Sequence, residues 1–282
     1  MKTINFHGLK LPAIGIGTWL MGSNPNTLDQ ESKTIQYGLN HGTNVIDTAE
    51  MYGDGDSEQL IGRAIKNFSR DKLFLISKFV PSHESKRQMN QALDRSLKNL
   101  GTDYLDLYLY HWRGMQPLSD TVANLEAAKQ AGKIRHWGVS NFDLSDMEDL
   151  MKVPNGKNVF ANEDLYNLGS RGIDYDLIPW QRKHRIPLIA YAPIDEADSR
   201  HHDLINNSIL KAVAKKHDAT VFQIMLAWCI RDGNTIAIPK TSSQKHMQSN
   251  LDAGDIDLTQ DDLNQINKVF PEPTSSQPLD II

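Results

Sequence analysis

Four side chains suited to acid–base chemistry lie at or just beyond the ends of apolar segments in the first half of the chain. Asp47 ends the segment 43–47, and Tyr52 follows it by five residues. Lys78 and His111 end the next two apolar segments. Each residue alone is well explained as a cap, a solvent-reaching strand end or a core histidine. Together, a carboxylate, a tyrosine, a lysine and a histidine near consecutive segment ends indicate one site.

The charges of these four groups are complementary if they converge. A dry, unpaired lysine is costly, and Asp47 can neutralise Lys78. The ammonium would in turn favour the phenolate of Tyr52 and lower its pKa from the ordinary value of about 10. Such a tyrosine can act as a general acid, and His111 can orient a carbonyl or donate to a developing alkoxide. The set contains no electron source, so we expect it to work with a bound hydride donor.

The elements that position these residues follow from the rhythm of the chain. Helical patterns, with apolar residues three and four apart, alternate with short apolar segments that predict strands. The predicted strands are residues 13–19, 43–47, 73–78, 104–111, 134–141, 159–164, 187–193 and 235–240. This alternation predicts a parallel sheet with right-handed crossovers. Eight units favour a closed (β/α)₈ TIM barrel of the α/β class over an open sheet.

We expect one domain over residues 1–282. Residues 1–12 are expected to form a hairpin with His7–Gly8 near its turn, ahead of the barrel. Extra helices are expected after the last strand, before a tail at 271–282. Because barrel active sites lie at the carboxyl ends of the strands, polar residues there are candidates. These strand-end residues are Asp47, Lys78, His111, Asn141, Glu163, Tyr191 and Lys240.

The composition excludes several classes of protein. A net charge of −5 and a pI of about 6.0 argue against a nucleic-acid binder. No apolar run is long enough to span a membrane, and the N-terminal segment lacks signal-peptide features. We therefore expect a cytoplasmic monomer that binds a small molecule. The single cysteine, Cys229, lies in an apolar helical pattern and should be a core residue. The pair His201–His202 has no partner ligands at metal-site spacing, so no metal is expected.

Ordered motifs then identify a family. "NVIDTAEMYG", "ISK", "LYLYHW", "GVSNF", "YNLGSRGIDYDLIPW", "AYAP" and "IPKTS" follow one another along the chain. In order and spacing they resemble the aldo-keto reductase superfamily, in particular its bacterial diketogluconate and methylglyoxal reductase-like members, from "GLKLPAIGIGTW" to about residue 270. The resemblance implies reduction of an aldehyde or ketone by hydride transfer from a nicotinamide cofactor, usually NADPH, with NADH as an alternative. It makes Tyr52 the general acid, Lys78 and Asp47 its tuning pair, and His111 the substrate-orienting residue.

The resemblance also assigns a cofactor groove across the top of the barrel. The residues assigned to the nicotinamide and its ribose are Gly17, Thr18, Asp47, Ser140, Asn141, Glu163 and Tyr191. Those assigned to the adenosine 2′-phosphate and the adenine are Lys240, Thr241, His246 and Asn250. Trp19 and Trp112, with His111, are expected at the substrate mouth, while Met21, Met51 and Met115 are expected to fill gaps in the packing.

The sequence departs from the family pattern at three places. Glu163 replaces the usual glutamine, and a carboxylate cannot donate a hydrogen bond to a carboxamide oxygen. If ionised, Glu163 would favour the positively charged oxidised nicotinamide. His246 replaces an arginine that often clamps the 2′-phosphate, so the preference for NADPH over NADH should be modest. The acidic segment 195–198 replaces a small, serine- and glycine-rich loop over the pyrophosphate.

Three functions remain open from the sequence. The leading one is an NADPH-dependent reductase of small aldehydes, ketones, dicarbonyls or keto-sugars. A Schiff-base aldolase with Lys78 as its nucleophile is a second, although pairing with Asp47 would keep Lys78 protonated. The third is a non-catalytic nicotinamide-binding sensor or scaffold, against which the intact set of four residues argues.

Overall fold

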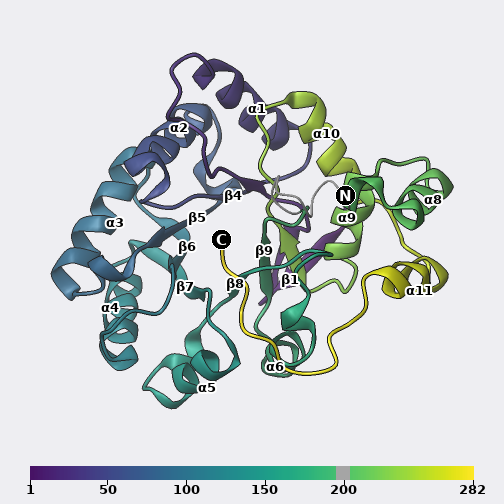
Figure 1. The fold of residues 1–282 in the computed structure, drawn as a ribbon. Coiled ribbons are helices and arrows are strands. Elements are labelled where there is room, and N and C mark those ends of the chain that lie inside the picture. The colour runs from purple at the N-terminus through teal and green to yellow at the C-terminus, as the bar shows by residue number, and fades with distance from the viewer. Residues whose placement is uncertain (195–203) are drawn as a thin grey trace.

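The computed structural model describes residues 1–194 and 204–282, and its centre is a barrel of parallel strands (Figure 1). The strands are β3 (Ile16–Gly17), β4 (Val45–Asp47), β5 (Phe74–Phe79), β6 (Leu105–Tyr110), β7 (Ile134–Ser140), β8 (Asn162–Leu165), β9 (Leu188–Tyr191) and β10 (Thr235–Ala237). They pair in sequence order from β3 to β10. Parallel bridges Ile14–Ala237 and Gly17–Lys240 join the first strand region to the last. The predicted eight-stranded barrel is confirmed.

A hairpin precedes the barrel, as predicted. Strands β1 (Thr3–Phe6) and β2 (Leu9–Pro12) pair antiparallel. The turn residues His7 and Gly8 have φ values of 50° and 92°, which is the pattern of a tight hairpin turn. His7 Nε2 lies 2.9 Å from the carbonyl oxygen of Phe160, just before β8. The hairpin therefore packs against the amino ends of the strands, away from the predicted site.

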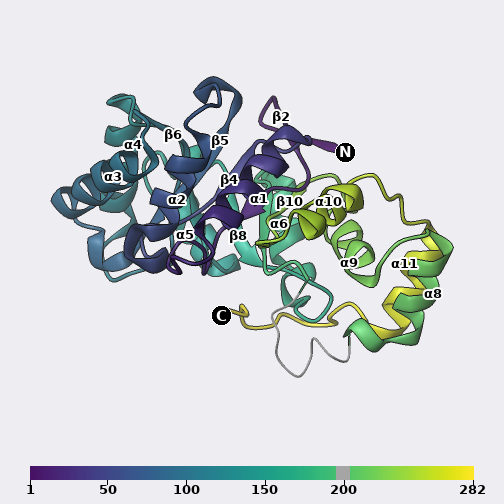
Figure 2. The same cartoon turned by 90° about the horizontal axis from the view of Figure 1, so that it is seen from above.

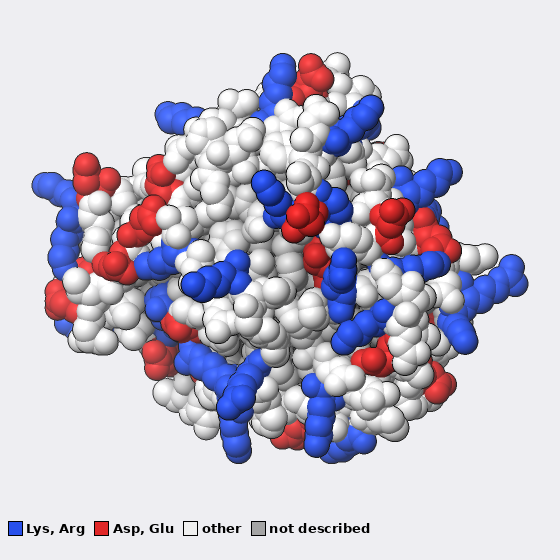
Figure 3. Space-filling view, turned by 180° about the vertical axis from the view of Figure 1, so that it is seen from behind, with Lys and Arg blue, Asp and Glu red and all other residues white. Residues whose placement is uncertain are grey.

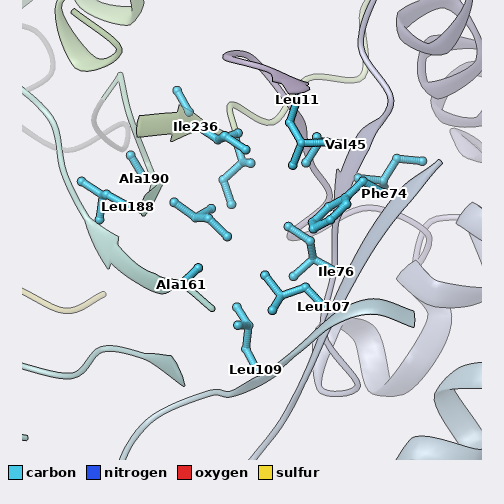
Figure 4. Packing of buried hydrophobic residues seen from close by; sticks show 14 of the residues in the cluster. Leu11, Val45, Phe74, Ile76, Leu107, Leu109, Ala161, Leu188, Ala190 and Ile236 are labelled. Carbon is cyan, nitrogen blue, oxygen red and sulfur yellow. The ribbon is translucent and has the colours of Figure 1, made fainter. Parts of the chain in front are cut away.

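Apolar side chains fill the interior between the strands. Figure 4 shows Leu11 of the hairpin beside Val45 and Phe74. Around them are buried aliphatic residues from successive strands, including Ile76, Leu107, Leu109, Ala161, Leu188, Ala190 and Ile236. Burying one such large side chain contributes about 1.5–3 kcal/mol. This packing fixes the strand ends, and with them the polar residues that follow.

Helices surround the sheet, as Figures 1 and 2 show. They are α1 (Leu28–Asn40), α2 (Asp56–Ile65), α3 (Lys86–Leu100), α4 (Leu118–Gln130), α5 (Leu144–Lys152), α6 (Leu177–His184), α8 (Ser208–Lys216), α9 (Val221–Cys229), α10 (Gln244–Ala253) and α11 (Gln260–Val269). Their ends follow local chemistry: Ser85 caps α3 at its start, and Gly101, with φ 66°, ends it.

Helices α10 and α11 follow the last strand, and the second of them lies outside the ring. Helix α11 lies beside α8 (Figure 2), and Asp262 of α11 is fully buried between them. Its carboxylate accepts from Lys216 at 2.7 Å and contacts His217 at 2.9 Å. These contacts hold the pair together although both helices are short.

Other sequence expectations concern the core and the surface. Cys229 is buried in α9, as predicted. Within the described ranges, no helix is long and apolar enough to cross a membrane, and no group of three or more metal-ligating side chains occurs. On the face shown in Figure 3, basic side chains lie among acidic ones, in keeping with the small net charge.

Candidate active site

The structure brings Asp47, Tyr52, Lys78 and His111 to the same end of the barrel. Asp47 is the last residue of β4, Lys78 lies near the end of β5, and His111 directly follows β6. These three strands are neighbours and parallel, so their carboxyl ends share one rim. Tyr52 begins the short 3₁₀ helix η1 (Tyr52–Gly55) that follows β4. We call these four residues, with Glu163, the reaction end of the groove.

Lys78 is the centre of the reaction end and is fully buried. Its Nζ donates to Asp47 Oδ1 at 2.6 Å, to the Thr48 carbonyl at 2.9 Å and to the Tyr52 hydroxyl at 3.5 Å. Glu163 Oε1 lies 3.3 Å from the same nitrogen. Burial lowers the pKa of Lys78, but Asp47, Glu163 and Tyr52 raise it more, and the net pKa is above its ordinary value. The side chain therefore stays an ammonium.

The pKa of Tyr52 differs from the sequence expectation. Burial raises the pKa, the Lys78 ammonium lowers it, and Asp47 and Glu163 raise it again, so that it lies above its ordinary value. The expected net lowering is not found, because burial, together with the carboxyl groups of Asp47 and Glu163, outweighs the Lys78 ammonium. Tyr52 is protonated, which is the form that a general acid requires.

A tight turn with positive φ values directly follows Tyr52 at the rim. Gly53, Asp54 and Gly55 have φ values of 59°, 51° and 94°, so the chain reverses directly after Tyr52. Glycine is favoured in this left-handed region. A Cβ atom at Gly53 would also collide with Ser23 Oγ. The "MYGDG" sequence therefore supplies the glycines that allow the turn as well as the Tyr52 hydroxyl.

His111 is a neutral imidazole at neutral pH. Burial, followed by the nearby Lys78 charge, lowers its pKa to about 3. Its ring packs edge-on to Tyr52 with 6.0 Å between ring centroids, and its Nδ1 has no hydrogen-bond partner among the described residues. The Asn141 side-chain amide donates to the His111 carbonyl at 3.0 Å and fixes the backbone there. A neutral imidazole beside the phenol suits the orientation of a carbonyl oxygen.

The residues assigned to the nicotinamide lie together beside the reaction end. Ser140 Oγ donates to the Glu163 carbonyl at 2.9 Å, and the Asn141 amide donates to Ser140 Oγ at 3.1 Å. The Tyr191 hydroxyl donates to Asn141 Oδ1 at 2.7 Å. Asn141 has a φ of 55°, a conformation that asparagine tolerates better than most residues. Strands β7, β8 and β9 thus present one connected polar surface.

Gly17 and Thr18 lie on the other side of the reaction end. Thr18 Oγ1 donates to the Asp47 carbonyl at 2.8 Å, and Gly17 pairs with Asp47 in the sheet. A Cβ atom at Gly17 would collide with the Ile238 carbonyl, so only glycine fits where the barrel closes. Gly17 and Thr18, predicted to lie near the nicotinamide ribose, therefore both contact Asp47.

The residues assigned to the adenosine lie at the end of β10 and along the first turns of α10. We call Lys240, Thr241, His246 and Asn250 the adenosine end. Lys240 and His246 are exposed, whereas Thr241 and Asn250 are buried. The Thr241 hydroxyl accepts from the Ser243 amide at 3.1 Å as the chain enters α10. A helix start next to an exposed ammonium favours an anionic group.

The residues expected at the substrate mouth and the expected gap-filling methionines differ in exposure. Trp19 and Trp112 are 41% and 38% exposed, and the Trp112 ring lies 4.8 Å from His111. Met21 is buried, as expected, but Met51 and Met115 are 48% and 97% exposed, so their interpretation as gap fillers is wrong. Both follow strand ends in loops, where helical periodicity gives no information about burial.

The C-terminal tail contributes a contact that the sequence did not predict. Figure 1 shows the tail running from α11 past α6 to the barrel mouth. Asp280 accepts from Ser170 Oγ at 2.8 Å, and the Ile282 backbone hydrogen-bonds to the Tyr191 hydroxyl. Tail positions lack periodicity, so no sequence signal indicates this approach. The acidic segment 195–198 and the pair His201–His202 lie outside the described residues.

Comparisons with known proteins agree with this geometry. A sequence profile described as the aldo/keto reductase family matches residues 13–270. Methylglyoxal reductase YeaE of Escherichia coli is 39% identical over 100% of this chain and 99% of that protein. Glyoxal reductase of Bacillus subtilis is 30% identical over 96% of each. A Klebsiella pneumoniae aldo/keto reductase, crystallised with NADP and acetate, has a TM-score of 0.97 and 43% identity over 100% of this chain and 99% of that chain. The chain belongs to the aldo/keto reductase family.

Proposed function

We propose that this protein is an NADPH-dependent reductase of small aldehydes, ketones, dicarbonyls or keto-sugars, with Tyr52 as the general acid. The observation that carries the proposal is the buried contact of Lys78 with Asp47 at 2.6 Å and with the Tyr52 hydroxyl at 3.5 Å. Relatives named for methylglyoxal and glyoxal support small dicarbonyls as the first substrates to try.

The residues present fit a nicotinamide dinucleotide. The linked side chains of Ser140, Asn141 and Tyr191 offer polar atoms suited to a carboxamide. The exposed Lys240 ammonium suits a phosphate. When bound, the reduced cofactor supplies the hydride that the side chains lack.

The chain's own residues supply orientation and the proton. His111, neutral because burial lowers its pKa to about 3, holds the carbonyl oxygen next to Tyr52. As the carbon accepts the hydride, the Tyr52 hydroxyl gives its proton to the oxygen, and the alcohol forms. Lys78 stabilises the phenolate left on Tyr52, since its ammonium already contacts that oxygen.

The aldolase alternative is disfavoured by Lys78 itself. A Schiff base needs a neutral amine, but the net effect of Asp47, Glu163 and Tyr52 raises the pKa of Lys78 despite its burial. Borohydride trapping of a carbonyl compound on Lys78 would revive that alternative.

A substrate panel tests the proposed function. NADPH and NADH consumption would be followed with α-dicarbonyls, simple aldehydes and keto-sugars, using Tyr52→Phe as the matched control. We expect NADPH-dependent reduction of at least one class by the wild type and none by the variant. Failure of the wild type to exceed the variant on every class would contradict the proposal.

A further inference from the structure

Glu163 lies in an unusual position for a carboxyl group. It is 1% exposed and reaches from β8 across the barrel interior to Lys78 of β5, although β6 and β7 separate these strands in the sheet. The same ammonium contacts Asp47 Oδ1 at 2.6 Å, so both carboxyl groups lie against one cation. Two carboxyl groups and one ammonium therefore share a site closed to solvent.

Two buried carboxyl groups against one ammonium require a proton. Ionised carboxylates only accept hydrogen bonds, so neither can bond to the other unless one of them is protonated. One ammonium balances one carboxylate, and a second buried negative charge would be uncompensated. In addition, Glu163 Oε2 is buried, and none of the described residues donates to it. The Lys78–Asp47 contact at 2.6 Å is shorter than the Lys78–Glu163 contact at 3.3 Å, which places the charge on Asp47 and the proton on Glu163.

A second buried glutamate has a different set of partners. Glu50 is 2% exposed, similar to Glu163. Its carboxylate accepts from the Val80 amide at 2.9 Å and Arg95 at 2.5 Å, and contacts His83 Nδ1 at 2.8 Å. Glu50 thus has a full set of partners for an ion, whereas the only cation among the described residues that contacts Glu163 is Lys78, which is already paired with Asp47.

Apart from Asp47, the neighbours of Glu163 hold their own charge states fixed. For Asp47, burial raises the pKa and Lys78 lowers it only in part. The titratable groups that face its side chain or the adjoining rim are Asp47 on β4, Lys78 on β5, Tyr52 on η1, Tyr191 on β9 and His111 after β6. Burial raises the pKa of Tyr52 and of Tyr191, and His111 is neutral. Burial, and then Asp47, raise the pKa of Glu163 well above the ordinary carboxyl value, and Lys78 lowers it only in part.

We propose that Glu163 is held protonated at neutral pH, shares this proton with Asp47, and makes the charge of the reaction end depend on pH. With the proton present, the three groups Lys78, Asp47 and Glu163 sum to zero charge. The protonated carboxyl then offers one donor and one acceptor, as an amide does. When the proton is lost, the cluster is negative. Glu163 is in this sense a positioning residue, because it acts on Tyr52 through Lys78.

The proposal has a consequence for cofactor binding, and this part rests on the proposed function. A positively charged oxidised nicotinamide beside the cluster favours the carboxylate, so its binding should release protons from Glu163. The uncharged reduced ring should not. The ratio of the dissociation constants for NADPH and NADP⁺ therefore should depend on pH.

Infrared spectroscopy of the cofactor-free protein tests the protonation state directly. At neutral pH we expect Glu163→Gln to lose one carbonyl-stretch band of a protonated, buried carboxyl. Asp164→Asn is the matched control, because Asp164 is the next residue of β8, equally buried, and contacts Gln181 of α6 instead. It should leave the Glu163 band in place. A spectrum of Glu163→Gln that has lost no such band would overturn the proposal.

Cofactor titrations test the consequence. NADP⁺ and NADPH would be titrated into weakly buffered wild type and Glu163→Gln with a pH-indicator dye. We expect more proton release with NADP⁺ than with NADPH in the wild type, and no difference in the variant. The wild-type ratio of dissociation constants should shift by up to about tenfold per pH unit through the titration of one group. Equal release in both proteins would contradict the linkage. If neither cofactor binds, the proposed function fails, while the infrared result still decides the state of Glu163.

Discussion

The reaction end and the adenosine end of the groove differ in how completely the protein itself holds their side chains. At the reaction end, Lys78 is buried and in contact with Asp47, Tyr52 and Glu163. At the adenosine end, Lys240 and His246 are exposed and project from the chain near the start of α10. The first arrangement fixes protonation states, and the second leaves charge available to a ligand.

This difference reflects what each end has to do. Proton transfer depends on pKa values and on sub-ångström geometry, which burial and paired charges control. Holding a phosphate needs only a nearby cation, and that cation can remain exposed to water. Substitutions at the reaction end should therefore change rate and stability together. Substitutions at the adenosine end should change cofactor affinity alone.

Tyr52→Phe should have the largest effect on rate. It removes the acidic proton but keeps the ring that packs against His111. We expect carbonyl reduction to fall by about 10²–10⁴-fold, the usual contribution of a general acid. NADPH binding, measured by fluorescence titration, should remain close to wild type. Retained turnover would refute the role of Tyr52.

Lys78→Met should affect rate and folding together. Removing one partner of a buried ion pair costs about 3–5 kcal/mol, because the other charge is left uncompensated. We expect a strong loss of activity and a lower midpoint in urea unfolding. The double variant Lys78→Met with Asp47→Asn should recover much of the stability but not the rate. Recovery of both would show that Lys78 has only a structural role.

Lys240→Met should weaken NADPH binding and leave NADH binding unchanged. A hydrogen bond to a charged group contributes about 1.5–3 kcal/mol, which corresponds to roughly tenfold or more in the dissociation constant. Lys245→Met, in the same helix turn as His246, is the control and should change neither constant. An equal loss of affinity for NADPH and NADH would contradict the assignment of Lys240 to the 2′-phosphate.

His246→Arg should give the smallest effect. An exposed pair of this kind contributes about 0.2–1 kcal/mol, so NADPH should bind a few-fold more tightly at most. The gain should shrink at high salt, because exposed charges are screened. Titrations at two ionic strengths measure both effects. A gain equal for NADH and NADPH would place His246 away from the 2′-phosphate.

Much of the fold was predictable, because strand and helix periodicities differ and glycines mark turns. The His7–Gly8 hairpin turn and the Gly101 C-cap are examples, and both depend on backbone conformations that few residues adopt. Four residues of the reaction end were predicted to converge because they lie at or just beyond the ends of neighbouring parallel strands, whose carboxyl ends share one rim. Their roles, the monomeric state, the single domain and the cytoplasmic location remain predictions.

Exposure in loops and the direction of one pKa shift were not predictable. Met115 follows β6 in a loop, where no period relates sequence to burial. The pKa of Tyr52 was expected to fall because the strand pattern places the Lys78 ammonium close to it. It rises because burial and the carboxyl groups of Asp47 and Glu163 outweigh the ammonium.

By itself, the sequence determined the order of strands and helices, the family, and the residue types at each strand end. These depend on local periodicity and on motifs, which are properties of neighbouring positions. Only the tertiary structure decided that Glu163 of β8 meets Asp47 of β4 across Lys78. The proton affinity of a carboxyl group depends on burial and on distances through space, and these exist only once the barrel has closed.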